Sequence, residues 1–282
     1  MVDAPGCEGL TRGAAPSPVL SRLFRGLRPT LHISHRGGAA LAPENTRAAF
    51  DSALERWHTD MLELDVHLTR DGELLVSHDP TVQRCTDGEG RISDFTLAEL
   101  QRLDAGYRFT TDGGTTFPFR GQGVRLPSLR EVLLAYPKVP LNIELKQDTP
   151  GAAEALAKQV RTGGATGHVC LGSELDALGK TLAALLPEVA HFYPRQALTE
   201  AVLAVKEGAP LPTDTPYTVL DMPYRFGEVT LVDADFLAAA ARANRWVNVW
   251  TVDDEADMCT LVSLGVGGIM TDRPDLLREV LG

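Results

Sequence analysis

Short apolar segments alternate with helical patterns along most of the chain, and this alternation constrains the fold more than any other feature. Apolar runs typical of strands start near residues 31, 61, 141, 168, 189, 217, 246 and 267, with helical spacing between them. Eight strand–helix repeats in about 250 residues predict a (β/α)8 barrel, the TIM barrel. The alternative is a doubly wound sheet, which usually has a GxGxxG loop after its first strand; HRGGAALAPEN (35–45) does not match it.

The composition fits a large α/β domain in a reducing compartment. The 282 residues are 44% hydrophobic, and a net charge of -11 argues against nucleic acid or an anionic membrane as the main partner. Cys7, Cys85, Cys170 and Cys259 are widely spaced without a CxxC motif, which indicates free thiols and no zinc site. We therefore expect a cytoplasmic protein.

Two segments interrupt the alternation. Residues 1–30 lack the continuous apolar core of a signal peptide, so we expect a leader that is flexible or lies as a strap over the barrel, which spans 31–282. Within the leader, PVLSRLFRGL (18–27) is amphipathic; contact with a membrane or a partner is a less favoured alternative. Residues 80 to about 125, rich in Gly, Asp and Thr, form an insertion after the second strand that carries one short helix, TLAELQRL (96–103). No apolar run approaches the roughly 20 residues of a membrane span, so no stable membrane association is expected.

The second strand, MLELDVHLT (61–69), carries acids on one of its faces. Side chains alternate across a strand, so Glu63, Asp65 and His67 share a side, opposite the apolar residues. Two carboxylates that face a barrel interior need a compensating partner such as a metal ion or a positive group. Whether His67 lies in the same pocket or beyond it is left open by the strand parity.

Polar residues also gather where other strands end, which is where TIM barrels carry their chemistry. They are His35, Arg36, His78, Asp79, Glu144, Lys146, Asn248, Trp250, Asp272 and Arg273. Taken singly, a Glu–Lys pair is often an ordinary salt bridge and a lone His is often structural. Taken together, Glu63, Asp65 and Glu144 supply hard oxygen ligands for Mg²⁺ or Ca²⁺.

The remaining members of the set complete the parts needed for phosphoryl transfer. His35 and His78 can serve as an acid–base pair near neutral pH, and which of them is the base stays open. Arg36 and Lys146 can hold an anionic group. A metal ion, an acid–base pair and a cationic clamp are what such a reaction uses.

Seven blocks of the chain, in order, resemble the signatures of glycerophosphodiester phosphodiesterases, most of all the cytoplasmic bacterial type. They are HRGGAALAPENTRAAF, LELDVHLTRDGELLVSHDPTVQRCTDGEG, LAELQRLDAG, LPSLREVL, NIELK, VWTV and GIMTDRPD. The resemblance covers about residues 31–282 and implies a TIM barrel with a small insertion after the second strand. It also implies hydrolysis of small glycerophosphodiesters, such as glycerophosphocholine or glycerophosphoethanolamine, to glycerol 3-phosphate and an alcohol.

The resemblance assigns roles residue by residue. His35 and His78 match the acid–base pair; Glu63, Asp65 and Glu144 match the ligands of one divalent ion. Arg36 and Lys146 match phosphate contacts, Trp250 matches an aromatic wall beside the substrate, and Glu44 and Asn45 match supporting residues. The attacking group is either the neighbouring glycerol hydroxyl, which would give a cyclic phosphate, or water.

The sequence leaves two alternative functions to consider. A phospholipase D-like activity on lysophospholipids or sphingomyelin would need apolar surface at the mouth, and the insertion offers Tyr107, Phe109, Phe117 and Phe119. We favour a packing role for these rings, because aromatic side chains are more often buried than ligand-binding. A non-catalytic scaffold would lack a member of the site, whereas this sequence has them all.

Overall fold

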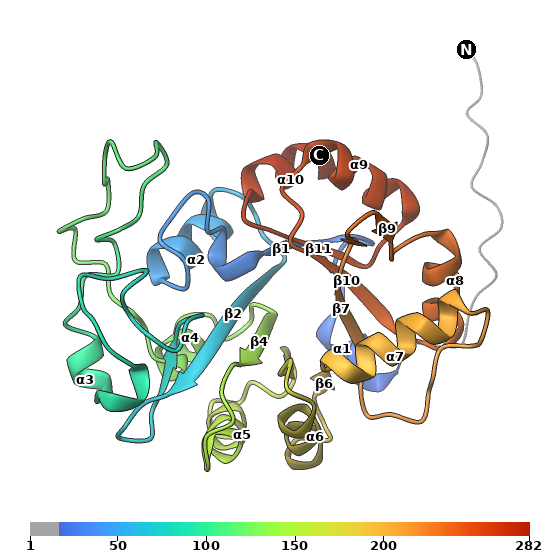
Figure 1. The fold of residues 1–282 in the computed structure, drawn as a ribbon, viewed down its shortest axis with the longest axis horizontal. Helices are drawn as coiled ribbons and strands as arrows, with labels where there is room; N and C mark the ends of the chain where they lie inside the picture. The colour runs from blue at the N-terminus through green and yellow to red at the C-terminus, as the bar shows by residue number, and fades with distance from the viewer. Residues whose placement is uncertain (1–16) are drawn as a thin grey trace.

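Eight parallel strands form a barrel in the computed structural model, which describes residues 17–282 (Figure 1). They are β1 (Leu31–Ser34), β2 (Met61–Leu68), β4 (Leu141–Leu145), β5 (Val169–Gly172), β6 (Ala190–His191), β7 (Val219–Pro223), β10 (Trp246–Trp250) and β11 (Gly268–Thr271). Hydrogen bonding follows the order β6-β5-β4-β2-β1-β11-β10-β7, and a parallel bridge between Phe192 and Val219 joins the last strand to the first. The predicted TIM barrel is confirmed.

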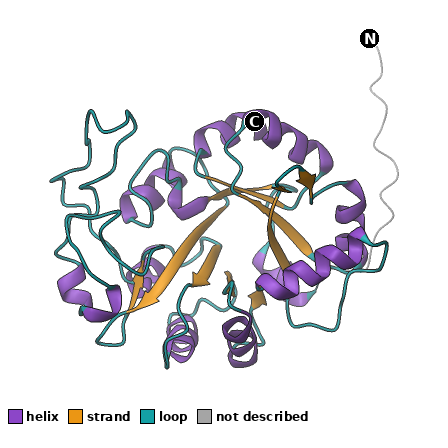
Figure 2. Cartoon of the chain, in the orientation of Figure 1, coloured by secondary structure: helices purple, strands orange, loops and turns teal. Residues whose placement is uncertain are grey.

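Helices cover the outside of the barrel (Figure 2). They are α2 (Arg47–Glu55), α4 (Leu129–Ala135), α5 (Ala152–Thr162), α6 (Asp176–Leu185), α7 (Arg195–Lys206), α8 (Ala234–Arg242), α9 (Glu255–Leu264) and α10 (Pro274–Leu281). The outward residues of the strands, such as Leu62 and Leu64, are buried in a core that includes Val132 of α4 and Leu156 of α5. Burying one such leucine contributes about 1.5–3 kcal/mol to folding.

Helix α2 corrects one expectation from the sequence. Pro43 and an acid, Glu44, are typical of a helix start and predict one there, but the helix begins at Arg47, where the Thr46 side chain accepts a hydrogen bond from the backbone N–H of Ala49. Asn45, just before the cap, has a left-handed φ of 57°. The segment from Pro43 to Asn45 is therefore a turn that returns toward the barrel, and Asn45 uses its side chain there rather than in a helix.

A short helix closes the N-terminal end of the barrel. Leu20 and Leu23 of α1 (Pro18–Leu23) are buried in one cluster with Leu31 and Met61, which open their strands. The ring of Phe24 stacks on Trp246 of β10 with centroids 4.2 Å apart. The apolar face of the amphipathic segment is thus used against the barrel interior. The rest of the expected leader, residues 1–16, lies outside the described residues.

The insertion lies beside α2 and α4, to the left in Figure 1, and has a small core of its own. It follows β3 (Leu74–Val76), which pairs antiparallel with β2, and it contains the 3-10 turn η2 (Ile92–Asp94) and α3 (Leu97–Leu100). In this core, Leu75 of β3 and Leu126 pack with the buried residues of the insertion, which are Val82, Ile92, Leu100 and Ala105. Its aromatic rings pack against one another and against Arg120: Phe109 meets Phe119 edge to face, and the guanidinium lies over Tyr107 and Phe117.

A small hairpin that the sequence did not predict follows β7. It consists of β8 (Arg225–Phe226) and β9 (Val229–Thr230). Arg225 ties it to α9 through two contacts with Asp257, at 2.6 and 2.8 Å. In the part of the chain from residue 17 onward, no helix combines the length and apolar character needed to cross a membrane.

Candidate active site

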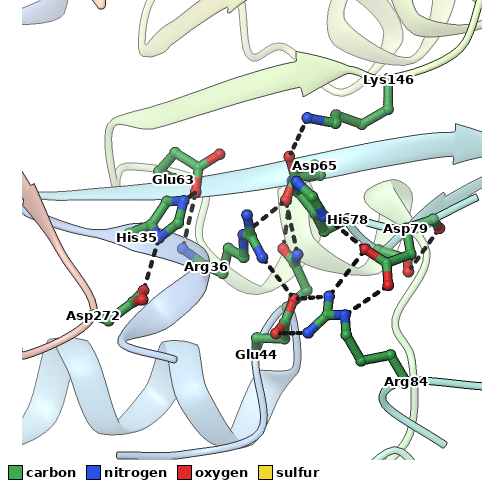
Figure 3. Close-up of polar contacts among 12 residues, drawn as sticks. His35, Arg36, Glu44, Glu63, Asp65, His78, Asp79, Arg84, Lys146 and Asp272 are labelled. Carbon is green, nitrogen blue, oxygen red and sulfur yellow. Dashed lines mark hydrogen bonds and ion pairs between the residues drawn. The ribbon is translucent and has the colours of Figure 1, made fainter. Parts of the chain in front are cut away.

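Strand β2 carries the carboxylates of the site on its inward face (Figure 3). Glu63, Asp65 and His67 point into the barrel and are buried, Asp65 and His67 with only 1% of their surface exposed. The alternate residues Leu62 and Leu64 pack outward against helices. The alternation of the sequence therefore places two acids and a histidine in a water-poor interior, where each needs a polar partner.

A tight turn after β1 brings His35 and Arg36 over these acids. In the 3-10 turn η1 (His35–Gly37), Arg36 has a left-handed φ of 52°, and its backbone N–H donates to Glu63 Oε2 at 2.9 Å. Gly37 has a φ of 83°, and a Cβ there would lie 2.8 Å from the side chains of Ala49 and Phe50. Only glycine lets the turn pack this closely against α2.

His35 is oriented by a carboxylate from the end of the chain. Its Nδ1 lies 2.7 Å from Asp272 Oδ1, and its Nε2 lies 3.9 Å from Glu63 Oε2. Burial favours the neutral ring, but the hydrogen bond to Asp272 and the charge of Glu63 outweigh it and raise the pKa of His35. Sequence reasoning noted Asp272 after the last strand but gave it no role.

His78, at the end of β3, has an equivalent partner. Its Nδ1 lies 2.8 Å from Asp79 Oδ1. Arg84 of the insertion binds Asp79 Oδ2 at 2.6 Å and both oxygens of Glu44 at 2.5 and 2.8 Å. Burial lowers the pKa of His78 by more than Asp65 and Asp79 raise it. Sequence reasoning missed Arg84, which lies in a segment without periodic structure.

Glu44 and Asn45 both contact side chains of the site. Glu44 Oε1 accepts from Arg36 Nη1 at 3.1 Å, so a chain of alternating charges runs from Arg36 through Glu44 and Arg84 to Asp79 (Figure 3). Burial would raise the pKa of Glu44, but Arg84 and Arg36 outweigh it and lower the pKa. Asn45 Nδ2 donates to Asp65 Oδ2 at 3.0 Å and fixes that carboxylate.

Glu144 of β4 stands directly opposite Asp65 of β2 in the sheet register. The ammonium of Lys146 lies between them, 3.1 Å from Glu144 Oε2 and 3.7 Å from Asp65 Oδ1. Burial raises the pKa of Glu144 despite the charge of this lysine. The three proposed ligands and both proposed phosphate-binding cations thus meet at one mouth, at the C-terminal ends of β1, β2 and β4.

The donor set fits a divalent metal ion in its chemistry. Six carboxylates at the mouth face three permanent cations; they are Glu44, Glu63, Asp65, Asp79, Glu144 and Asp272 against Arg36, Arg84 and Lys146. Burial and the neighbouring Asp65 raise the pKa of Glu63 to about 8. Within residues 17–282 no three His, Cys, Asp or Glu side chains already stand as a metal cage, and Lys146 occupies the gap between Asp65 and Glu144. The surplus of carboxylate oxygens at the mouth is what a hard cation would neutralise.

Trp250 and Asn248 share a face of β10 but have different surroundings. Trp250 ends the strand, is 42% exposed and lies beside Pro223, close in sequence to the β8–β9 hairpin. Asn248 is buried below the mouth, where Asn248 and Asn142 each donate to one oxygen of Asp221. Burial raises the pKa of Asp221 to about 6. Asn248 therefore belongs to a deeper layer and not to the mouth.

Paired histidines, clustered carboxylates and fixed cations at the mouth of a TIM barrel are the parts that a barrel hydrolase of anionic substrates uses. The comparisons with known proteins are specific. Residues 35–276 match the model of the glycerophosphoryl diester phosphodiesterase family. The chain belongs to this family and is a phosphoric diester hydrolase. Members of the family generally depend on a divalent metal ion.

Individual relatives agree with this assignment. A glycerophosphodiester phosphodiesterase of Caldanaerobacter subterraneus subsp. tengcongensis is 34% identical, over 89% of this chain and 98% of the relative. A human lysophospholipase D is 28% identical, over 89% of this chain and 85% of the relative. A crystal structure of an Oleispira antarctica phosphodiesterase with the product sn-glycerol-3-phosphate matches with a TM-score of 0.68 and 25% identity, over 88% of this chain and 95% of that one. A Mycobacterium tuberculosis domain has the same fold, with a TM-score of 0.81 at 20% identity, over 90% and 99%.

Proposed function

We propose that the protein hydrolyses glycerophosphodiesters such as glycerophosphocholine and glycerophosphoethanolamine to glycerol 3-phosphate and an alcohol. The observation that carries this proposal is the matched orientation of two histidines. His35 and His78 each hold an aspartate through Nδ1, which leaves Nε2 of each ring for the substrate. Between them lie the carboxylates of β2, so an acid and a base flank the place where an anionic phosphate would be bound.

Glu63, Asp65 and Glu144 are the residues that would hold the divalent ion, Mg²⁺ or Ca²⁺. When bound, the ion would neutralise these acids and polarise a phosphoryl oxygen. Arg36 and Lys146 bind the other phosphate oxygens. In support, Arg36 Nε is buried without a hydrogen-bond acceptor, although it makes an ion-pair contact of 3.5 Å with Asp65. The guanidinium therefore has hydrogen-bonding capacity that its protein partners do not fill, and a phosphate oxygen is the kind of acceptor that suits it.

The two histidines move the protons of the reaction. One takes the proton from the attacking oxygen, and the other gives a proton to the departing alkoxide. The attacking oxygen belongs either to the glycerol hydroxyl next to the phosphate, which forms a cyclic phosphate that water then opens, or to water itself. Trp250 at the rim gives the organic part of the substrate an aromatic surface.

The test is release of glycerol 3-phosphate from glycerophosphocholine, with EDTA and after adding back Mg²⁺ or Ca²⁺. We expect EDTA to abolish release and one ion to restore it. His35→Ala and His78→Ala should each lose on the order of 10²-fold or more in kcat. His58→Asn, which changes an exposed histidine away from the mouth, is the control. Normal turnover by His35→Ala, or no release with any ion, would contradict the proposal.

A second candidate is the lysophospholipase D-like reaction on lysophospholipids or sphingomyelin. The observation in its favour is apolar surface on the hairpin that follows the C-terminal end of β7. Phe226 and Val229 are 77% and 57% exposed, a few residues after Pro223, which pairs with Trp250. The insertion aromatics offer less support, because they pack against one another. Faster cleavage of lysophosphatidylcholine than of glycerophosphocholine would place this function first, and Phe226→Ser should then slow only the lipid reaction.

A further inference from the structure

His67 is a buried histidine next to the site, and the reaction proposed above gives it no role. It is the third inward residue of β2, two positions after Asp65, and 1% of its surface is exposed. Its backbone pairs with Leu75 of β3, the short strand that leads to His78. A buried imidazole must satisfy two ring nitrogens, so its partners indicate what it holds in place.

Both nitrogens of His67 bind segments that carry residues of the site. Nε2 lies 2.9 Å from the backbone oxygen of His78. Because a carbonyl can only accept, the ring donates from Nε2. Nδ1 lies 2.8 Å from Oε1 of Gln147, the residue after Lys146; an amide oxygen also accepts, so the ring donates from Nδ1 as well. The Gln147 amide nitrogen in turn donates to the backbone oxygen of Leu68 at 3.2 Å. One ring thus joins the segment of His78 to the end of β4.

We propose that His67 is a positioning residue that sets the place of His78. This inference rests on the role of His78 in the proposed function. The last ladder hydrogen bond of this segment runs from the Ser77 N–H to the Asp65 oxygen at 3.0 Å. The bond from His67 extends the attachment to β2 by one residue, to His78 itself. Asp79 then orients the ring, but only after the main chain of His78 has been placed.

The effect of losing this bond follows from geometry. The His78 side chain is 30% exposed, and its segment leaves a strand of only three residues, so the surrounding core does little to fix it. A displacement of about 1 Å between an acid–base group and its substrate can cost about 10²-fold in rate. By contrast, β2 is already paired with β1, β3 and β4, so the barrel does not need His67 to form.

The test compares His67→Leu, which removes both hydrogen bonds, with His67→Gln, which keeps an N–H that can reach the carbonyl. His191→Leu is the matched control. His191 of β6 is also buried, and its ring also binds a backbone oxygen, that of Leu186, at 2.9 Å. We expect His67→Leu to lose about 10-fold or more in kcat, with KM for glycerophosphocholine within about two-fold of wild type. His67→Gln should recover most of the rate. His191→Leu should lower Tm but keep kcat per folded molecule.

Two kinetic outcomes would overturn the inference: wild-type kcat for folded His67→Leu, or His67→Gln as slow as His67→Leu. A third readout needs no turnover. Histidine-ring NMR of the wild type should show a slowly exchanging Nε2–H proton that disappears in His67→Gln, and its absence would equally overturn the inference. If the wild type does not cleave glycerophosphocholine, the proposed function has failed, and the same variants are then compared on lysophosphatidylcholine, for which His78 has the same task.

Discussion

His35 Nδ1 and Asp272 Oδ1 lie 2.7 Å apart although 237 positions separate them in the sequence. The contact exists because β1 and β11 are neighbours in the closed barrel, with Ser34 opposite Thr271. Closure of the barrel therefore completes the polar environment of His35. The histidine and its partner directly follow the first and the last strand of the barrel.

Replacing Asp272 should slow the reaction without unfolding the protein. In Asp272→Asn the ring loses the charge that helps to raise the pKa of His35, and an amide no longer dictates which nitrogen carries the proton. We expect a loss of about 10- to 100-fold in kcat, the range for residues that support a reacting group, with little change in KM. Asp275→Asn, which removes a partner of Arg273 in α10, is the control. Equal kcat in the two variants would contradict the assignment.

Arg84 should matter more than its exposed position suggests. Its fork binds Glu44 and Asp79 at once, and a lysine cannot reproduce this planar pattern. Arg84→Lys should therefore reduce kcat/KM, by less than Asp272→Asn does. Arg161→Lys breaks a similar two-bond contact, with Glu188 just before β6 at the opposite end of the barrel, and should leave kcat/KM unchanged. A loss shared by both variants would indicate a general effect of the substitution.

Glu144→Gln should weaken the binding of the divalent ion. The substitution removes one charged ligand and also frees Lys146 from its 3.1 Å contact. We expect the ion concentration that gives half-maximal activity to rise by about 10-fold or more, as measured by titration of the EDTA-treated enzyme. Glu188→Gln is the control, because that side chain pairs with Arg161 at the surface, away from the mouth. An unchanged titration for Glu144→Gln would remove this residue from the metal site.

Asp221 should make the stability of the protein depend on pH. Burial raises its pKa from 3.8 to about 6, so the folded protein binds this proton more tightly than the unfolded chain. The resulting stabilisation is fully present below about pH 4 and is lost as the pH rises through 6. At about 1.4 kcal/mol per pKa unit it amounts to about 3 kcal/mol.

Asp221→Asn should remove this dependence. Asn142 Oδ1 has no hydrogen-bond partner, so the Asn142 amide can turn and accept from the new side chain. From pH 4 to 7.5 the free energy of unfolding of the wild type should therefore fall relative to that of the variant. Thermal or urea unfolding at each pH measures this difference. Asp214→Asn at an exposed loop should show no such trend. A parallel pH course for wild type and Asp221→Asn would contradict the prediction.

The sequence predicted the barrel because strand and helix periodicity depends on neighbouring residues alone. The period of two in β2 already placed Glu63 and Asp65 inward and the leucines outward, since alternation is a property of any strand. The predicted start of α2 was wrong because Pro43 and Glu44 suit the first turn of a helix as well as they suit a turn before one. The contact of Asn45 with Asp65 holds this segment as a turn. That contact joins residues 20 positions apart.

The partners of the two histidines follow from tertiary structure alone. Asp272 reaches His35 only after the barrel closes, and Arg84 reaches Glu44 only when the insertion folds back over the loop after β1. Nothing in the periodicity of either segment carries this information. The β8–β9 hairpin is likewise too short, at two residues a strand, to leave a pattern in the sequence.

The apolar layer around Leu20 and Leu23 has a consequence for how substrate enters and product leaves the enzyme. Because α1 and the stack of Phe24 on Trp246 close one end of the barrel in the described part of the chain, the route to the site is the mouth at the other end. In the reaction proposed above, the incoming diester and the departing glycerol 3-phosphate would share that entrance and the same anion-binding side chains. Product that accumulates should therefore compete with substrate for entry, and turnover should slow as the reaction's own output builds up.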